Sequence, residues 1–216
     1  VTPVSGVYRQ ASPSVGKQLE GGLKYQLPGT TLLLTAAGFH IEQSNVLVAI
    51  PPNMDTYTQS GLVHSDGFEF EAHAEPFRNL MLTAAVSVQK IKDDSTNKPL
   101  TQSSKGNASL FAFYTMPSGR LKGFGFGGGM RYTARTYGGE LESGSVWLPQ
   151  YALFDAAISY DLSNMAHSLH GWKLSANVRN LFDKNYIANC YADGSVGGYC
   201  FFGERRNAQA SIGYSW

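Results

Sequence analysis

Apolar and polar residues alternate with a period of two along most of the chain. This is the pattern of strands that place one face in an apolar medium and the other in water. The alternation runs to the last residue, where Trp216, Tyr214 and Ile212 share one face with Ala210 and Ala208. The same pattern predicts nine strands, at about 18–27, 30–44, 64–74, 80–89, 106–116, 124–132, 152–161, 172–179 and 203–216.

The third predicted strand shows which medium the polar face meets. Phe68 and Phe70 alternate with Glu69, Glu71 and His73. Carboxylates on one face do not suit a packed core, because a buried charge without a partner is costly. They suit a hydrated interior, and Arg131, Arg179 and Lys173 are predicted to face the same interior.

The connections between these strands are alternately short and long. The long segments are 1–17, 45–63, 90–105, 134–150 and 183–202. Tight turns at one end and long loops at the other are typical of an up-and-down barrel in the outer membrane. Strands of this length also match a tilted membrane span. We therefore predict that the long segments are extracellular and that the C-terminal Trp216 is periplasmic.

The composition fits this all-β reading and excludes several alternatives. Charged residues make up 15% of the chain, and no run of 18 apolar residues encodes a membrane helix. The net charge of +1, without a basic cluster, argues against a nucleic-acid partner. Gly125, Gly127 and Gly129 lack the Lys-Ser/Thr pair of a phosphate loop, so we interpret them as part of a strand with an inward-facing groove.

Nine is an odd number of strands, whereas single-chain bacterial barrels usually have an even one. A plugged transporter has ~22 strands. Residues 1–216 are therefore predicted to be the C-terminal part of such a transmembrane antiparallel barrel, without its plug and its N-terminal strands. The first residue, Val1, is not Met, so the chain is either processed or begins within a longer protein.

The two cysteines, Cys190 and Cys200, lie close together in one segment rich in glycine and tyrosine. In an oxidising compartment such a pair forms a disulfide, and two free thiols are the alternative. A metal site would need more ligands, and the five histidines show no zinc-like grouping, so we predict no metal site.

Several motifs resemble TonB-dependent outer-membrane receptors. They are residues 177–186 (NVRNLFDKNY), 203–206 (GERR), 16–25 (GKQLEGGLKY) and 67–72 (GFEFEA). The paired cysteines before Phe201-Phe202-Gly203 look most like ferrichrome-type receptors for hydroxamate siderophores. The resemblance implies a plugged barrel in the Gram-negative outer membrane that binds a ferric siderophore. It further implies import with energy from the TonB complex through the missing N-terminal region, and contact with membrane lipid or lipopolysaccharide. The ferric siderophore is then a ligand, and no cofactor is expected.

Aromatic residues of the last long segment are the candidates for ligand contact, because aromatic rings suit the apolar flank of an iron chelate. They are Tyr191, Tyr199, Phe201 and Phe202. The alternative is that these rings only pack the segment against its neighbours. Trp147, Tyr137 and Tyr57 are weaker candidates, and Trp147 also suits a girdle at the membrane boundary.

Three other functions compete with import of a siderophore. A passive porin would need neither a plug nor energy coupling. An outer-membrane enzyme would need a nucleophile with its base, and the sequence offers no convincing Ser–His set, so we predict no enzymatic activity. A soluble β-sandwich would have shorter strands and less regular connections.

Overall fold

Nearly all of the described chain is β-structure, as the alternating pattern predicts. The computed structural model describes the backbone of all residues except 1, 5–6, 10, 51–52, 95 and 195–196. The side chains of residues 1–10, 48–58, 60, 95, 167 and 195–196 are not described, so the weaker candidate Tyr57 lies outside the described side chains. Among the described residues, no helix has the length and apolar character to cross a membrane.

The strands fall into a long group and a short group. The long strands are β3 (Val15–Gln26), β4 (Leu33–Ile50), β5 (Asn53–Phe77), β6 (Leu80–Asp93), β9 (Gly106–Thr115), β10 (Phe124–Thr133), β13 (Tyr151–Asp161), β14 (Trp172–Arg179) and β17 (Asn207–Tyr214). The short strands are β1 (Thr2–Val4), β2 (Val7–Arg9), β7 (Lys98–Pro99), β8 (Ser103–Ser104), β11 (Thr136–Leu141), β12 (Gly144–Leu148), β15 (Ile187–Asp193) and β16 (Gly197–Phe202). Two 3₁₀ turns, η1 (Leu162–Asn164) and η2 (His167–Leu169), lie between β13 and β14.

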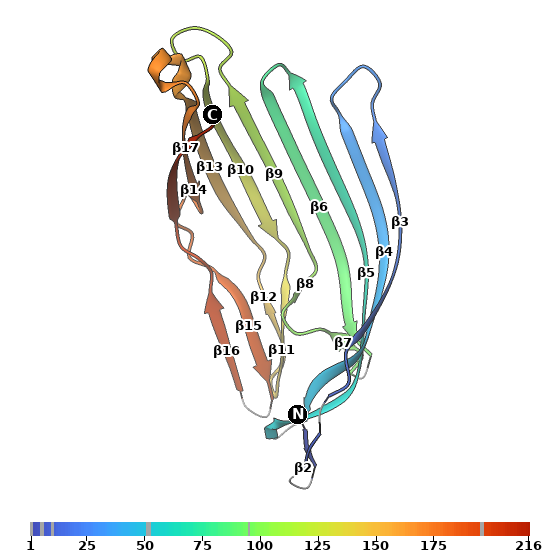
Figure 1. Cartoon of the computed structure of the whole chain (residues 1–216). Coiled ribbons are helices and arrows are strands. Elements are labelled where there is room, and N and C mark those ends of the chain that lie inside the picture. Colours follow the sequence, from blue (N-terminus) through green and yellow to red (C-terminus); the bar gives the residue numbers. More distant parts are fainter. Residues whose placement is uncertain (1, 5–6, 10, 51–52, 95, 195–196) are drawn as a thin grey trace.

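The long strands form one curved antiparallel sheet (Figure 1). Over the described residues, nine strands follow the order β17-β14-β13-β10-β9-β6-β5-β4-β3, and β7 pairs with β6 beside this path. Each long strand therefore pairs with its sequence neighbour in the wall, which confirms the up-and-down order. In this part of the chain β3 and β17 are the two edges and do not pair with each other.

The cross-strand register carries a single apolar face through the whole sheet. One continuous row joins Tyr25, Leu34, Ala72, Ala84, Leu110, Met130 and Phe154. A second row continues the same face to the C-terminal edge through Phe124, Tyr160, Leu174 and Ile212. Residues directly opposite in an antiparallel pair lie on the same side of the sheet. The alternation that begins at Trp216 therefore belongs to the same side as Leu34, seven strands away in the sheet.

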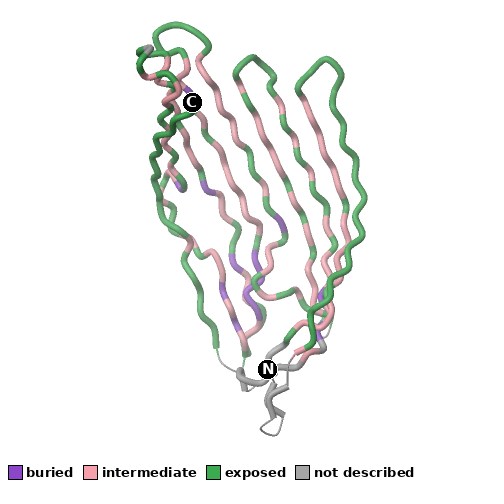
Figure 2. Tube along the Cα trace, in the orientation of Figure 1, coloured by how far each residue is buried: buried purple, intermediate pink, exposed green. Residues whose placement is uncertain are grey.

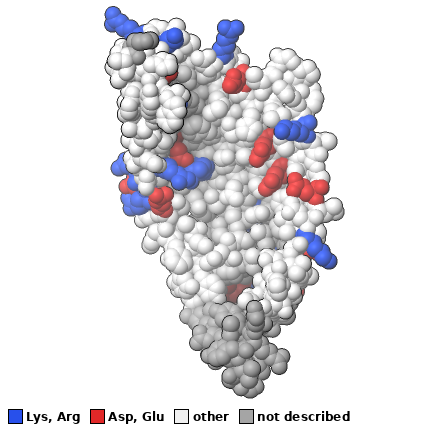
Figure 3. Space-filling view, viewed as in Figure 1, with Lys and Arg blue, Asp and Glu red and all other residues white. Residues whose placement is uncertain are grey.

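The other side of the sheet is polar, as predicted from the third strand. Glu71 lies in one row with Ala85, Ser109 and Arg131. A cavity of about 360 Å³ opens on this side and is lined by polar residues that include Glu69, Ser87 and Asn107. Charged side chains of both signs gather across the middle of the face shown in Figure 3, while much of the remaining surface is uncharged.

The predicted groove at the glycines of β10 is filled by two phenyl rings. A Cβ atom at Gly125 would lie 2.6 Å from ring atoms of Phe113, and one at Gly129 would lie 2.6 Å from a ring atom of Phe111. The two rings are nearly parallel, with centroids 6.5 Å apart and an interplanar angle of 13°. The prediction of an open groove was therefore wrong, because the neighbouring strand β9 supplies side chains that occupy the space.

Short connections gather at one end of the sheet and hairpins at the other (Figure 1). The short-turn end holds residues 27–32, 78–79, 116–123 and 162–171, and the C-terminus. The hairpin end holds a second sheet of the order β12-β11-β15-β16, in which β8 also pairs with β11. Most buried residues lie toward the hairpin end (Figure 2), among them Leu148, Leu153 and Cys190.

The segments predicted as long loops contain paired strands, which corrects the sequence analysis. β4 and β5 continue as one hairpin through most of residues 45–63, with register shifts near Val46 and Ile50. Segment 134–150 holds the β11–β12 pair, segment 183–202 holds β15–β16, and segment 90–105 holds the end of β6 with β7 and β8. These strands lie beyond the apolar band, where neither face of a strand contacts an apolar medium. Alternation of apolar and polar residues is therefore not required there, and the sequence carries no periodic signal.

Candidate functional site

The hairpin of β15 and β16 carries the aromatic candidates, and its two strands are joined by a disulfide. Cys190 and Cys200 are directly opposite each other, with Cα atoms 4.0 Å apart. Cys190 is buried beside Gly138, where a Cβ atom would lie 3.2 Å from the Cys190 Cβ and from Leu148 Cδ1. The disulfide therefore joins β15 to β16 at this register, while the packing of Cys190 and the pairing of β15 with β11 connect the hairpin to the second sheet.

Three of the four candidates form an aromatic row on this hairpin. Tyr191 lies opposite Tyr199, with ring centroids 5.7 Å apart, and Tyr199 meets Phe201 edge to face at 5.4 Å. Tyr199 is 59% exposed and Phe201 is 54% exposed. Since β16 is exposed along its whole length, these rings form an accessible surface rather than a packed layer.

Asn189, opposite Phe201, adds a polar group to the aromatic row. Its Oδ1 atom is buried and has no hydrogen-bond partner among the described residues. A buried acceptor without a donor is uncommon in proteins. The row therefore ends at an unused acceptor, which the sequence analysis did not identify.

Phe202 does not join this row. The register shifts between Ile187 and Asn189, so Phe202 pairs with Ile187. Its ring is 70% exposed and lines a cavity of about 280 Å³ together with Tyr151, Lys184 and Tyr186. Tyr151 and Tyr186 lie against each other, with ring centroids 4.4 Å apart. Sequence reasoning missed these two tyrosines because they meet only through folding.

The motif residues around Asn180 form the base of the hairpin. Asn180 is 2% exposed and has a left-handed backbone, with φ of 50°. Its Oδ1 accepts a hydrogen bond from the Lys184 N–H at 2.8 Å, while its Nδ2 donates to the carbonyls of Lys184 and Glu204 at 2.9 and 3.1 Å. One amide thus joins the chain leaving β14 to the chain entering β17.

Asp183 and Arg205 make a second connection between the same two segments. The Asp183 carboxylate accepts hydrogen bonds from Nε and Nη2 of Arg205 at 2.9 and 2.6 Å, and from the Arg206 N–H at 3.0 Å. These donors hold the pKa of Asp183 well below its ordinary range, the Arg205 contact being the largest cause. The NLFD and GERR motifs are therefore joined in space and are structural.

The weaker candidates Tyr137 and Trp147 belong to the second sheet. Tyr137 is 2% exposed, packs against Trp147 at 5.1 Å and donates a hydrogen bond to Glu140 at 2.6 Å. Burial raises the pKa of Tyr137. Trp147 lies beneath Lys105 Nζ, 4.7 Å from the ring centroid, and lines a cavity of about 450 Å³. Tyr137 is thus a packing residue, whereas Trp147 remains accessible from a cavity.

Arg131 and Asp155 form an ion pair on the polar face. Arg131 donates from Nε and Nη2 to Asp155 at 2.5 and 2.9 Å, and Asp155 also accepts from the Asn180 N–H at 2.9 Å. Within the described residues, no group of three or more His, Cys, Asp or Glu side chains could hold a metal ion. These contacts join β10, β13 and the start of the hairpin base.

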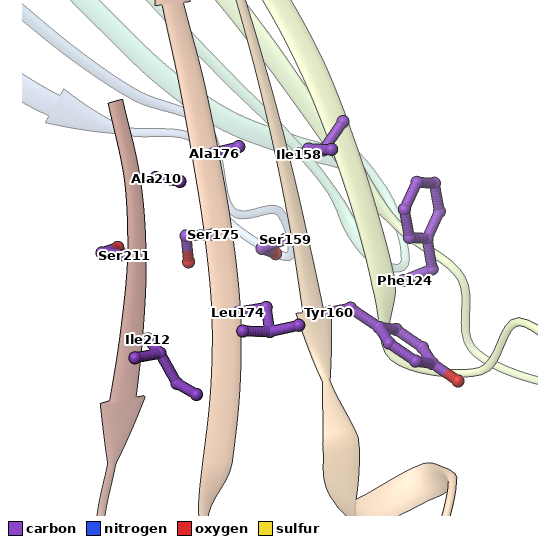
Figure 4. A pocket seen from close by; sticks show the side chains of 10 residues that line it. All are labelled: Phe124, Ile158, Ser159, Tyr160, Leu174, Ser175, Ala176, Ala210, Ser211 and Ile212. Carbon is purple, nitrogen blue, oxygen red and sulfur yellow. The ribbon is translucent and has the colours of Figure 1, made fainter. Parts of the chain in front are cut away.

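A cavity of about 560 Å³ lies on the apolar side of the sheet (Figure 4). It crosses β10, β13, β14 and β17 between the side chains of Ile158, Leu174 and Ile212, with Phe124 and Tyr160 beside them. Small residues, Ala176 and Ala210, form part of its floor. This shallow groove suits an apolar chain and lies far along the wall from the aromatic row.

Comparison with known proteins identifies relatives over nearly the whole chain. It is 32% identical to the ferrioxamine B receptor of Salmonella typhimurium, over 94% of this chain and 28% of that protein. It is 33% identical to the ferrichrome outer membrane transporter/phage receptor of Escherichia coli, over 93% of this chain and 26% of that protein. The chain thus spans little more than a quarter of the length of these relatives.

A solved structure shares the fold. The ferripyoverdine receptor of the outer membrane of Pseudomonas aeruginosa superposes with a TM-score of 0.71 at 22% identity, over 95% of this chain and 28% of the other. The family model described as "TonB dependent receptor-like, beta-barrel" matches residues 3–181. The chain therefore belongs to the TonB-dependent receptor β-barrel family.

Proposed function

We propose that the protein containing this chain is an outer-membrane receptor that binds a ferric siderophore and imports it with energy supplied by TonB. Membership of the family supports this function over a passive porin. The two relatives described above are named for ferrioxamine B and ferrichrome, which supports a hydroxamate-type siderophore as the ligand.

The observation that carries the proposal is the exposed aromatic row on the β15–β16 hairpin. Tyr191, Tyr199 and Phe201 present ring faces and edges on a disulfide-linked hairpin, so little conformational entropy is lost when they meet a ligand. Phe202 points to the opposite face of β16 and lines the separate cavity at Tyr151 and Tyr186. Such rings contact the apolar flank of a chelate whose iron is already fully coordinated.

The distribution of connections supports one orientation in the membrane. The hairpin end is extracellular and the short-turn end, with the C-terminus, is periplasmic, as in other outer-membrane barrels. Trp172, Tyr214 and Trp216 lie together at the short-turn end, where rings suit the lipid–water boundary. The apolar face then contacts membrane lipid, including lipopolysaccharide in the outer leaflet.

A titration of the intact receptor with ferrichrome and with ferrioxamine B tests this proposal. We expect Phe201→Ala and Phe202→Ala each to weaken binding of the siderophore. Binding is measured by the quenching of intrinsic fluorescence. Phe68→Ala is the matched control, because Phe68 is 51% exposed but lies on the apolar face. Unchanged affinity in both hairpin variants would remove these rings from the site, and absence of TonB-dependent uptake would reject the transport function.

A further inference from the structure

The hairpin leaves and re-enters the wall at a single point. Arg179, the last residue of β14, is directly opposite Asn207, the first residue of β17. Residues 180–206 therefore project from a base whose two sides are adjacent. Beyond the base, β15 pairs with β11 through Ala192 and Gly139, so the orientation of the hairpin depends on this pairing and on the contacts at the base.

The contacts at this base are concentrated within a few residues of the aromatic surface. The N–H of Gly203 donates to the Tyr186 carbonyl at 2.8 Å, and a Cβ atom at Gly203 would lie 2.0 Å from Tyr186 Cζ. Phe202 immediately precedes this contact. Arg205 follows two residues after Gly203 and completes the bidentate pair with Asp183.

The backbone at Asp183 is unusual, because its φ of 53° lies in the left-handed region. Aspartate and asparagine tolerate this conformation better than most residues do. The N–H of Asp183 also donates to the Asn180 carbonyl at 2.8 Å, so the carboxylate is presented from a tight turn. A tight turn fixes the Asp183 carboxylate, and the Arg205 guanidinium donates two hydrogen bonds to it. The pair therefore fixes the relative orientation of the two groups as well as attracting them to each other.

We propose that Asp183 and Arg205 form a positioning latch that sets the orientation of the β15–β16 hairpin, and thereby of Phe202 and the aromatic row, for ligand capture. The part concerning ligand capture rests on the proposed function. The latch touches no ligand itself. Its effect is preorganisation: a hairpin held in the binding orientation loses less freedom when the ligand arrives.

The test uses the intact receptor with Asp183→Asn, Arg205→Gln, Arg205→Lys and the double variant D183N/R205Q. Asn keeps the left-handed backbone while removing the charge. We expect D183N and R205Q to weaken binding of ferrichrome or ferrioxamine B about two- to fivefold, as for an exposed ion pair with bidentate geometry. The double variant should lose no more than the larger single effect, because both remove one interaction. Arg205→Lys should recover part of the loss.

Glu204→Gln is the matched control. Glu204 neighbours the latch, but its carboxylate accepts only the local hydrogen bond from Asn207 at 2.9 Å among the contacts observed. We expect the Glu204→Gln receptor to bind ferrichrome or ferrioxamine B with the affinity of the unmodified receptor. A loss in Glu204→Gln as large as that in D183N would overturn the assignment of a specific latch.

Hydrogen exchange of the amides of residues 197–202 supplies a readout that does not depend on a ligand. We expect exchange about three- to tenfold faster in D183N and R205Q, with barrel amides of β13 unchanged. Unchanged exchange in both variants overturns the latch, whatever the ligand.

If F202A weakens binding while D183N does not, the latch is wrong and the proposed function stands. If the receptor binds no siderophore but exchange rises, the latch stands and the proposed function is wrong.

Discussion

Trp172 and Tyr214 lie directly opposite each other on β14 and β17, and their ring centroids are 5.0 Å apart. Trp216 continues this contact, with its ring 6.3 Å from that of Tyr214. The end of the chain is therefore fixed by aromatic packing on the apolar face as well as by backbone pairing. This arrangement explains how a terminal strand can keep its register up to its last residues.

Removing the Tyr214 ring should weaken the terminal strand. We expect Tyr214→Ala to destabilise the barrel by about 0.5–1.5 kcal/mol beyond the loss of buried area. Tyr214→Phe keeps the ring and should behave like the unmodified protein. The measurement is the temperature at which the folded barrel loses its compact mobility on a gel. Equal midpoints for the Ala and Phe variants would contradict the role of the ring.

The packing of Phe111 over β10 predicts a sharp difference between two glycines. At Gly129 a Cβ atom would lie 2.6 Å from the Leu110 carbonyl oxygen and from Phe111 Cδ2, whereas at Gly213 no atom lies within 4 Å. We expect Gly129→Ala to destabilise the protein by about 1–3 kcal/mol, because the backbone oxygen cannot move aside.

Gly213→Ala is the control for this experiment, since both glycines lie in long strands and only Gly129 is crowded. Its unfolding midpoint should match that of the unmodified protein. If both variants unfold at the unmodified temperature, the close approach of β9 to β10 is wrong.

The Asp183–Arg205 pair predicts how the hairpin base responds to pH. The pKa of Asp183 in the folded protein is held below its ordinary value of 3.8, by Arg205 first and by the Arg206 N–H second. A lowered carboxyl pKa contributes stability that is complete above the ordinary pKa and is lost as the pH falls below it. We therefore expect protease resistance of residues 180–206 to stay constant from neutral pH down to about pH 4.

Below that pH the resistance of this segment should fall, and Asp183→Asn should abolish this dependence. The protease used must itself remain active in acid, and cleavage of the barrel wall serves as the internal reference. A fall in resistance between pH 7 and pH 5 that persists in the Asn variant would show that another group controls the hairpin base.

The disulfide predicts a simple result for the purified protein. Without reductant, denatured protein should contain no free thiol from Cys190 or Cys200, and reduction should release two. Closing so short a loop is expected to stabilise the hairpin by about 2–3 kcal/mol. Cys190→Ser with Cys200→Ser should thus increase cleavage within residues 183–202. Two free thiols in protein that was never reduced would exclude the bond.

Much of the wall could be predicted from the sequence because each strand of the wall crosses an apolar band. The band requires an apolar residue at every second position, so the pattern of Phe68, Glu69, Phe70 and Glu71 is readable without knowing any partner strand. Beyond the band this requirement ends. The continuation of β4 to Ile50 and of β5 from Asn53 depends on pairing between distant backbone groups and carries no periodic signal.

The candidate site divides in the same way. Local sequence predicted the nine strands of the wall, their apolar and polar faces, and the aromatic residues near the cysteines. Only the tertiary structure showed that Gly197–Phe202 is a strand, on which consecutive side chains point to opposite faces, so that Phe202 is separated from Tyr199 and Phe201. Only folding brought Tyr151 to Tyr186 and Asp183 to Arg205, since their contacts join segments far apart in the chain. Alternation is a local property of a strand that has one face in an apolar medium and the other in water. The contact partner of a side chain, in contrast, depends on the whole fold.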